Sequence, residues 1–253
     1  MNYTSRIEAE TCEFWPGTTP WQDQWGSLGS YPGRYGYGGC IERVRIPREN
    51  LIEWWDWVED HYVVWPAVKV SPRETQGLAD WLESKGYQRA ESQDLMVQDR
   101  QSSWQDGFSP LVVEPSTLAQ LSQVYQLDNQ VFADPLPTMA EMAEHLVRLK
   151  SGHRHQFCLL GEAGVAITAG GLTAFSGWGL LWGGETHPTY RGRGFYHVMV
   201  RHRLWFAYLH NCDFVAVYAT KETSQPILAN MGFSVVETVD IFRPPVHRQY
   251  PRK

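Results

Sequence analysis

The ten residues from His187 to Tyr196, HPTYRGRGFY, constrain this chain more than any other segment. They follow the apolar run Trp178–Trp182, which predicts a strand, and they lead into residues 195–209, where apolar side chains recur with the period of a helix. A strand, a glycine-rich turn and a helix in this order expose backbone N–H groups at the positive end of the helix dipole. The segment therefore predicts an anion site, and a phosphate is the expected anion.

Composition narrows the class of protein. The 253 residues suffice for one large domain or two smaller ones, and the formal net charge of −6 argues against a general nucleic-acid binder. No apolar stretch is long enough to span a bilayer, and the N-terminus lacks a hydrophobic signal core. The spacing of the cysteines fits neither a metal site nor a redox pair, which predicts a reducing, cytoplasmic location; they are Cys12, Cys40, Cys158 and Cys212.

The chain divides at a polar, breaker-rich stretch, residues 98–107, which predicts an N-terminal region over 1–107 and a second domain over 108–253. In the second domain the apolar patterns predict the order β-α-α-β-β-β-α-β-α-β, an α+β sheet with helices packed on it. The expected strands are 111–113, 156–160, 165–175, 178–186, 214–218 and 233–242, and the expected helices are 116–132, 138–149, 195–209 and 224–231.

The N-terminal region is less regular. Residues 12–39 are rich in glycine, proline and aromatic residues and predict long loops, whose aromatic side chains either cage a cationic substrate or fill the core of a small domain. Residues 51–57 predict an amphipathic helix with a tryptophan face. Residues 67–87 resemble residues 215–233 across a two-residue gap, each reading as strand, Glu-Thr turn, short helix and Gly-aromatic pair. The N-terminal region is therefore a candidate partial copy of the second domain.

Two phosphate-binding motifs fail at the turn. A dinucleotide-binding fingerprint needs a third glycine, but Gly192-Arg-Gly194 is followed by Phe195, Tyr196 and His197. A P-loop needs Gly-Lys-Ser/Thr, and the turn holds neither the lysine nor the hydroxyl that binds magnesium.

A third motif fits. The turn resembles the Gln/Arg-x-x-Gly-x-Gly/Ala pattern of the GNAT superfamily of acyl-coenzyme A N-acyltransferases: Arg191, Gly192, Arg193 and Gly194 match it, and Tyr196 replaces the last small residue. Met231-Gly-Phe233 matches the family's Leu-Gly-Phe. The resemblance covers about residues 111–242. It implies a GNAT-like mixed, mostly antiparallel central sheet flanked by helices, preceded by a smaller α/β N-terminal region.

The resemblance also implies the ligand. Acetyl-CoA is the expected co-substrate, and no metal is needed. The backbone amides of the turn would hold the coenzyme A pyrophosphate, and the strand end at Thr186 and His187 would lie beside the thioester arm. Ser224, the expected N-cap of a short helix, would contact the pantetheine. The expected residues of the turn are Arg191, Gly192, Arg193, Gly194, Phe195 and Tyr196.

Acyl transfer to an amine needs a base, an oxyanion donor and a route for a proton to the leaving thiolate. Glu185 is the leading base candidate, with pairing to Arg191 or Arg193 as its structural alternative. His187 is a second base or shuttle, and the N–H of Thr186 or His187 is the expected oxyanion donor. The family's usual tyrosine acid is replaced by Leu228. Tyr218 or Tyr196 substitutes for it, or no acid is needed.

The sequence thus predicts an acetyl-CoA-dependent N-acetyltransferase that acts on a small amine or amino-acid-like acceptor by direct attack on the thioester. A catalytically impaired acyl-CoA sensor or scaffold is the alternative, because the usual acid is missing. Acyl transfer from a carrier-protein thioester is a third possibility, which the acidic balance disfavours. We expect a monomer or homodimer that binds neither nucleic acid nor membrane.

Overall fold

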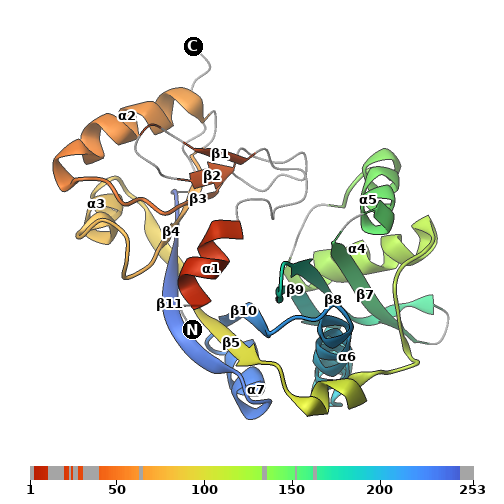
Figure 1. Cartoon of the computed structure of the whole chain (residues 1–253). Coiled ribbons are helices and arrows are strands. Elements are labelled where there is room, and N and C mark those ends of the chain that lie inside the picture. The colour runs from red at the N-terminus through yellow and green to blue at the C-terminus, as the bar shows by residue number, and fades with distance from the viewer. Residues whose placement is uncertain are drawn as a thin grey trace. The chain divides into compact units, whose positions relative to one another are not determined.

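The chain folds into two compact units in this computed structural model. It describes residues 3–10, 20–22, 24, 28–30, 40–62, 65–132, 136–151, 153–161 and 164–245. The first unit comprises Met1–Leu95, Ala219–Pro226 and Val235–Lys253, and the second comprises Met96–Tyr218 and Ile227–Ser234. Figure 1 labels their helices and strands, and the two units are described in turn.

The second unit is a mixed sheet with helices packed on it (Figure 1). Its strands run in the order β10-β9-β8-β7-β6; β9 and β10 are parallel and the other neighbours are antiparallel. The α+β, mostly antiparallel sheet predicted from the sequence is confirmed. The elements are η3 (Ser102–Gly107), β6 (Val112–Val113), α4 (Leu118–Phe132), α5 (Met139–Ser151), β7 (Arg154–Leu160), β8 (Ala166–Phe175), β9 (Trp178–Thr186), η5 (Pro188–Tyr190) and α6 (Phe195–Leu209), with parts of β10 (Phe214–Thr220) and α7 (Ser224–Asn230).

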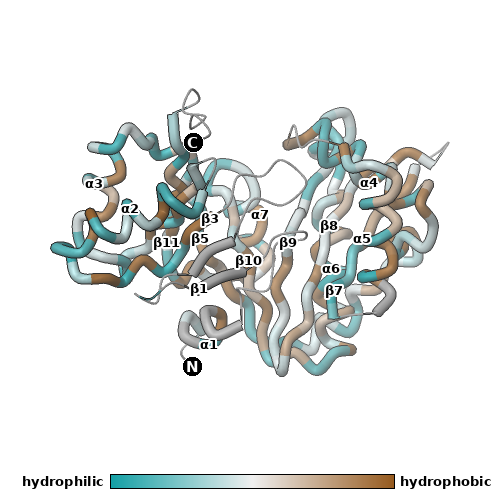
Figure 2. The backbone as a smooth tube through the Cα atoms, turned by 90° about the horizontal axis from the view of Figure 1, so that it is seen from above, coloured by the Kyte–Doolittle hydropathy of each residue, from teal (hydrophilic) through white to brown (hydrophobic). Residues whose placement is uncertain are grey.

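The two faces of this sheet can be told apart at β8. Ala169 packs with Val124 and Leu127 of α4 in one buried apolar cluster. The next residue, Gly170, points the other way because successive strand residues alternate, and a Cβ there would lie 2.8 Å from the Arg203 guanidinium of α6. Helix α4 therefore covers one face and α6 the other. Figure 2 shows hydrophilic and hydrophobic residues interspersed along α4 and α5, as expected of helices with one buried side.

The first unit has its own strands, in the order β1-β2-β3-β4-β11-β5. Strands β3 and β4 are parallel, whereas β1–β2, β2–β3 and β4–β11 are antiparallel. Strands β1 and β2 fall within residues 12–39, where the composition predicted long loops. The elements are α1 (Tyr3–Glu10), β1 (Pro20–Gln22), β2 (Leu28–Ser30), β3 (Cys40–Glu42), η2 (Arg48–Asn50), α2 (Leu51–His61), β4 (Ala67–Val70), α3 (Leu78–Ser84), β11 (Ser234–Arg243) and most of β5 (Gln88–Asp99).

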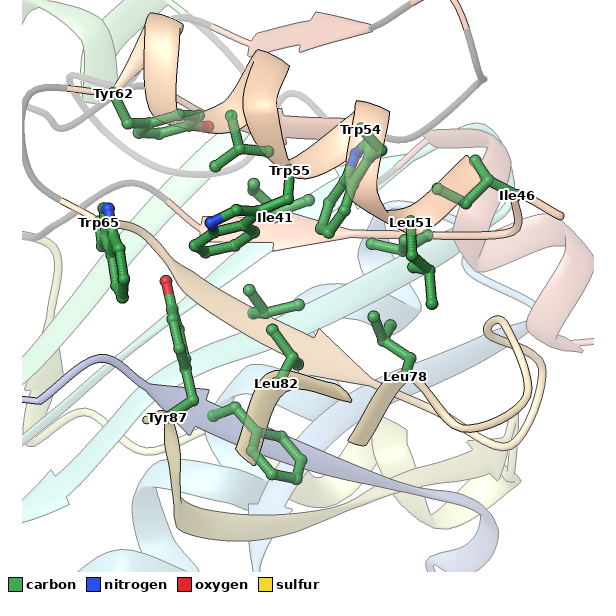
Figure 3. Packing of buried hydrophobic residues seen from close by; sticks show 14 residues of the cluster. Ile41, Ile46, Leu51, Trp54, Trp55, Tyr62, Trp65, Leu78, Leu82 and Tyr87 are labelled. Carbon is green, nitrogen blue, oxygen red and sulfur yellow. The ribbon is translucent and has the colours of Figure 1, made fainter. Parts of the chain in front are cut away.

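A tryptophan cluster forms the core of the first unit (Figure 3). Helix α2 buries Leu51, Trp54, Trp55 and Val58, spaced as one side of a helix requires. The Trp55 ring meets the rings of Trp65 and Tyr87 edge-on, at centroid distances of 5.1 and 5.6 Å. These tilted contacts suit the aromatic quadrupole, so the tryptophan face predicted at residues 51–57 serves packing.

The suspected repeat has matching local geometry in its two copies, β4-α3-β5 and β10-α7-β11. After α3 the N–H of Tyr87 donates to the Leu82 carbonyl at 3.0 Å, and after α7 the N–H of Phe233 donates to the Leu228 carbonyl at 3.1 Å. The final strands are exchanged: β11 lies next to β4, and β5 lies next to β10. The predicted division at residue 107 leaves all C-terminal residues with the second domain, whereas Val235–Lys253 belong to the first compact unit. The assignment of 1–107 and 108–253 as domains stays a prediction.

Candidate active site

The predicted strand–turn–helix is present in the second unit. Gly192 and Gly194 have φ of 73° and 82°, which glycine adopts without strain, and Gly194 is the N-cap of α6. The first bond of that helix runs from the Val198 N–H to the Gly194 carbonyl at 3.1 Å. The N–H groups before Val198 therefore have no partner within the helix and face outward from its start. The first turn holds no acidic side chain, so nothing local opposes an anion.

The two arginines of the turn differ in what they contact. The Nε of Arg191 donates to the Thr186 carbonyl at 3.2 Å and so ties the turn to the end of β9. The Arg193 guanidinium lies over the Tyr190 ring, 5.4 Å from its centroid. The turn itself, residues 191–194, is exposed to solvent. Its amides are accordingly accessible to a ligand.

Strand β9 leaves its parallel partner before it ends. Its register with β10 runs from Trp178 to Leu181, although the strand continues to Thr186. Along the other edge, two steps on β8, from Ala169 to Gly171, match three steps on β9, so β9 carries a bulge between Trp182 and Glu185. A bulge bends its strand. Beyond Leu181, where the pairing with β10 stops, the last residues of β9 therefore leave the β10-side edge of the strand unpaired with that strand.

Backbone direction decides which amide faces that edge. The N–H of His187 donates to the Ile167 carbonyl at 2.9 Å, on the β8 side. Because neighbouring strand residues direct their N–H groups to opposite edges, the Thr186 N–H faces away from β8. Of the two oxyanion donors that the sequence predicted, the His187 N–H is thus occupied. Thr186 is the one whose direction fits.

Glu185 is buried, with only 3% of its surface exposed and both carboxylate oxygens removed from solvent. It lies opposite Ala169 in the β8–β9 register, and paired residues share a face, so its side chain points toward α4. There it contacts the carboxyl of Asp128. The structure places the guanidinium groups of Arg191 and Arg193 on other partners, Thr186 and Tyr190.

Asp128 was missed by the sequence analysis. Burial raises the pKa of its carboxyl, and its hydrogen bond with Glu185 acts in the opposite direction. A signal was available in the helical spacing, because Asp128 lies one turn after the buried Val124 and directly after the buried Leu127. A carboxyl on the inner side of an amphipathic helix is unusual and indicates a specific partner.

His187 caps the short helix η5. Its Nδ1 accepts from the Thr189 N–H at 3.3 Å and lies 2.5 Å from the Thr189 hydroxyl oxygen. This contact favours a structural role for that ring nitrogen. A base or shuttle role of His187 would fall to its other ring nitrogen and stays a prediction.

The candidate acids lie in different surroundings. Tyr218 is half-buried and is the first residue of β10 beyond its pairing with β9. Tyr196 packs under the bulge, and burial raises its pKa while the Arg203 guanidinium lowers it. Leu228 is completely buried in α7. Ser224 belongs to the first unit, where its hydroxyl accepts from the Thr220 N–H at 3.0 Å.

A buried arginine supports the bulge from the α6 side. The Nη1 of Arg203 donates to the carbonyls of Gly171 and Trp182, each at 3.2 Å. Charge-assisted bonds to two carbonyls offset part of the cost of burying the guanidinium.

Among the residues that the structure describes, no group of three or more His, Cys, Asp or Glu side chains could hold a metal ion. Nor does any described helix have the length and apolar character needed to cross a membrane.

Comparison with solved structures identifies the fold. A GCN5-related N-acetyltransferase from Kribbella flavida superposes with a TM-score of 0.60 at 10% identity, over 96% of this chain and 95% of that one. One from Sphaerobacter thermophilus gives 0.60 at 13% identity, over 98% and 88%. A tandem GNAT protein from the clavulanic acid biosynthesis pathway gives 0.58 at 14% identity, over 90% and 83%. No protein-family model and no curated protein matches the sequence. The chain therefore has the GNAT fold, as the turn motif predicted.

Proposed function

We propose that this protein is an acetyl-CoA-dependent N-acetyltransferase whose acceptor is the amine of a small molecule or amino-acid-like compound. The observation that carries the proposal is the combination, within the GNAT fold, of an open glycine turn at the start of α6 and a bulged strand, β9, that carries Glu185 next to its last residue, Thr186. One feature suits a pyrophosphate and the other a reacting thioester. A cytoplasmic location and a monomeric or dimeric state remain predictions.

In this proposal the turn binds the cofactor. Amides from Arg191 to Tyr196 donate to the pyrophosphate, and charge-assisted bonds contribute about 1.5–3 kcal/mol each, so three or four would dominate cofactor affinity. The outward edge at Thr186 is available to pair with the pantetheine arm. His187 and Ser224 remain proposed contacts of that arm.

In this proposal the residues at the end of β9 carry out the acyl transfer. A lysine-like amine is protonated at pH 7, and its neutralisation costs about 4.6 kcal/mol. Glu185 takes that proton, directly or through water. The amine nitrogen attacks the thioester carbonyl carbon, the Thr186 N–H stabilises the oxyanion, and the C–S bond then breaks. The thiolate takes a proton from Tyr218 or from water, which a leaving-group pKa near 8.5 permits.

One observation favours a second function, an acyl-CoA sensor or scaffold. Leu228, at the place of the family's usual acid, is completely buried and bonds to nothing through its side chain. A protein that binds the cofactor without turning it over needs no acid there. The two functions share the turn and differ at Glu185.

A thiol-release assay with acetyl-CoA across amines, amino acids and peptides tests the proposal. Glu185→Gln should lower kcat/KM by about 100-fold or more, as expected for a lost general base, and should leave acetyl-CoA binding by calorimetry nearly unchanged. Glu144→Gln, on the exposed side of α5, is the matched control. Undiminished turnover in Glu185→Gln would refute the base assignment. Binding of acetyl-CoA without thiol release for any amine would favour the sensor.

A further inference from the structure

A buried hydroxyl on β8 lies behind the proposed oxyanion donor. We propose that Thr168 is a positioning residue for the Thr186 N–H: its hydroxyl holds the Glu185 carbonyl, which belongs to the same peptide group, and so aims the N–H at the thioester oxygen. The inference rests on the proposed function, because it specifies how the oxyanion donor of that reaction is held. It adds a residue of β8 to a site otherwise built from β9 and the turn.

Two threonines face each other across β8 and β9. Thr168 and Thr186 are partners in the register, and only 0% and 9% of their surfaces are exposed. The Thr186 hydroxyl donates to the Thr168 hydroxyl at 3.2 Å, and the Thr168 hydroxyl donates to the Glu185 carbonyl. A carbonyl can only accept, so the single hydroxyl proton of Thr168 is directed at it. The two hydroxyls therefore form a chain of hydrogen bonds that ends on the backbone of Glu185.

The peptide bond links this carbonyl to the oxyanion donor. The Glu185 carbonyl and the Thr186 N–H belong to one planar, trans peptide group, in which the C=O and the N–H point in opposite directions. A carbonyl that is directed at Thr168 of β8 consequently directs the N–H to the other edge of β9, beyond the pairing with β10. Rotation of the peptide group away from this orientation would break the bond to Thr168.

The next peptide group along β9 is held by other partners. The Thr186 carbonyl accepts from the Nε of Arg191 at 3.2 Å, and the His187 N–H donates to the Ile167 carbonyl at 2.9 Å. These two bonds fix the backbone that follows the donor. The bond from Thr168 acts on the peptide group that contains the donor itself.

The same bond makes the amide a better donor. A hydrogen bond to the carbonyl oxygen draws electron density toward that oxygen and leaves the N–H more positive, which is how hydrogen bonds in a chain polarise one another. Thr168 faces α6, because it precedes Ala169, which packs against α4, and successive strand residues alternate. It therefore acts from the side of the sheet opposite to the Glu185 carboxylate, and the oxyanion donor and the base are held separately.

Removal of one hydroxyl tests the assignment. Thr168→Val should lower kcat about tenfold and change the acetyl-CoA dissociation constant by no more than about twofold, because an oxyanion donor acts mainly on charge that develops in the transition state. Thr168→Ser restores the hydroxyl and should recover most of the rate. Thr173→Val removes a hydroxyl from the same strand, where it accepts from the Nε1 of Trp182 at 3.0 Å, and as the matched control it should keep the wild-type kcat.

Three results of these assays would overturn the proposal. They are an unchanged kcat in Thr168→Val, a Thr168→Ser variant as slow as Thr168→Val, and an equal loss in Thr173→Val. Thr168→Cys answers the question if Thr168→Val does not fold, since a thiol is a weaker hydrogen-bond donor than a hydroxyl. Its kcat should lie below that of Thr168→Ser, and a wild-type kcat in Thr168→Cys would also overturn the proposal.

A second measurement does not depend on turnover. Infrared spectra of the whole protein with acetyl-CoA, isotopically labelled at the thioester carbonyl and without an acceptor, report how strongly that carbonyl is polarised. Its C=O band should move to lower frequency on binding to the wild type and to Thr173→Val, and should move less on binding to Thr168→Val. Equal shifts in the wild type and Thr168→Val would overturn the proposal.

The two measurements separate this inference from the proposed function. If the band shift depends on Thr168 but no amine releases thiol, Thr168 positions the donor and the proposed acetyl transfer is wrong. If amines release thiol and neither kcat nor the band shift depends on Thr168, the proposed function stands and the role of Thr168 is refuted.

Discussion

The two units bury chemically different side chains beneath a helix. Under α2 the first unit packs a tryptophan cluster whose members are apolar rings, with Trp55 at its centre. The second unit buries ionisable groups on both faces of its sheet: Glu185 on the α4 side, beside the half-buried Asp128 of α4, and Arg203 on the α6 side. Burying an aromatic ring lowers the free energy of the folded state, whereas burying a charge raises it unless partners compensate.

The difference distinguishes a core that serves stability, in the first unit, from buried groups that could take part in a reaction, in the second. A layer of rings can be exchanged for other rings of similar volume, because packing asks only for shape. A buried carboxyl such as that of Glu185 is worse for stability than a packed apolar side chain, so it indicates a use other than stability. We therefore assign the proposed reaction to the second unit. The predictions below test the comparison, from the largest expected effect to the smallest.

Trp55→Ala should destabilise the protein most. The substitution removes a fully buried ring that contacts Trp65, Trp81 and Tyr87, and large-to-small changes of this kind cost about 3–5 kcal/mol. Denaturant unfolding measures the loss. Trp57→Ala, on the same helix but only partly buried, should cost clearly less. Equal losses in the two variants would argue against a core centred on Trp55.

Arg203→Met should cost about 2–4 kcal/mol, because the carbonyls of Gly171 and Trp182 lose a charged donor while they stay buried. The matched control is Arg201→Met on the exposed side of α6, with an expected loss below about 1 kcal/mol. Melting temperature and denaturant midpoint report both. If Arg203→Met is as stable as wild type, the guanidinium does not support the bulge.

Gly194→Ala should weaken acetyl-CoA binding about tenfold, since a side chain at a φ of 82° strains the turn and misdirects its amides. Gly164 provides the control, with a φ of 74° and open space around its Cβ position, in the turn between β7 and β8. Gly164→Ala carries the same backbone strain and should leave the dissociation constant unchanged. Calorimetric titration with acetyl-CoA separates the two, and parallel losses would point to a general effect on folding.

Lowering the pH should destabilise the second unit through protonation of His145. Its folded pKa of about 4 lies below the value of about 6.5 for an unfolded chain, so the unfolded state binds more protons between these values. Stability therefore falls as the pH drops from about 6.5 to about 4, by at most about 1.4 kcal/mol per pH unit for this group. His145→Gln should flatten that slope, whereas His61→Gln at the end of α2 should not. An unchanged slope in His145→Gln would contradict a neutral buried histidine.

Local sequence patterns predicted much of the structure of the second unit. The order of its strands and helices and the glycine turn follow from alternation, helical periodicity and the special backbone of Gly192 and Gly194, all of which act over a few residues. Asp128 did not follow, because its partner Glu185 lies across a helix–sheet interface far along the chain. The exchange of β5 and β11 was not predicted for the same reason, because strands that are neighbours in a sheet but far apart in sequence leave no periodic pattern in the sequence.

That exchange has a consequence for synthesis. Strand β11 pairs with β4, and its Phe242 enters the tryptophan cluster opposite Val68. A ribosome makes Phe242 174 residues after Val68, because 242 − 68 = 174. The aromatic cluster of the first unit is consequently incomplete, and its surface is open to chaperones or to misassembly, until β11 has been synthesised.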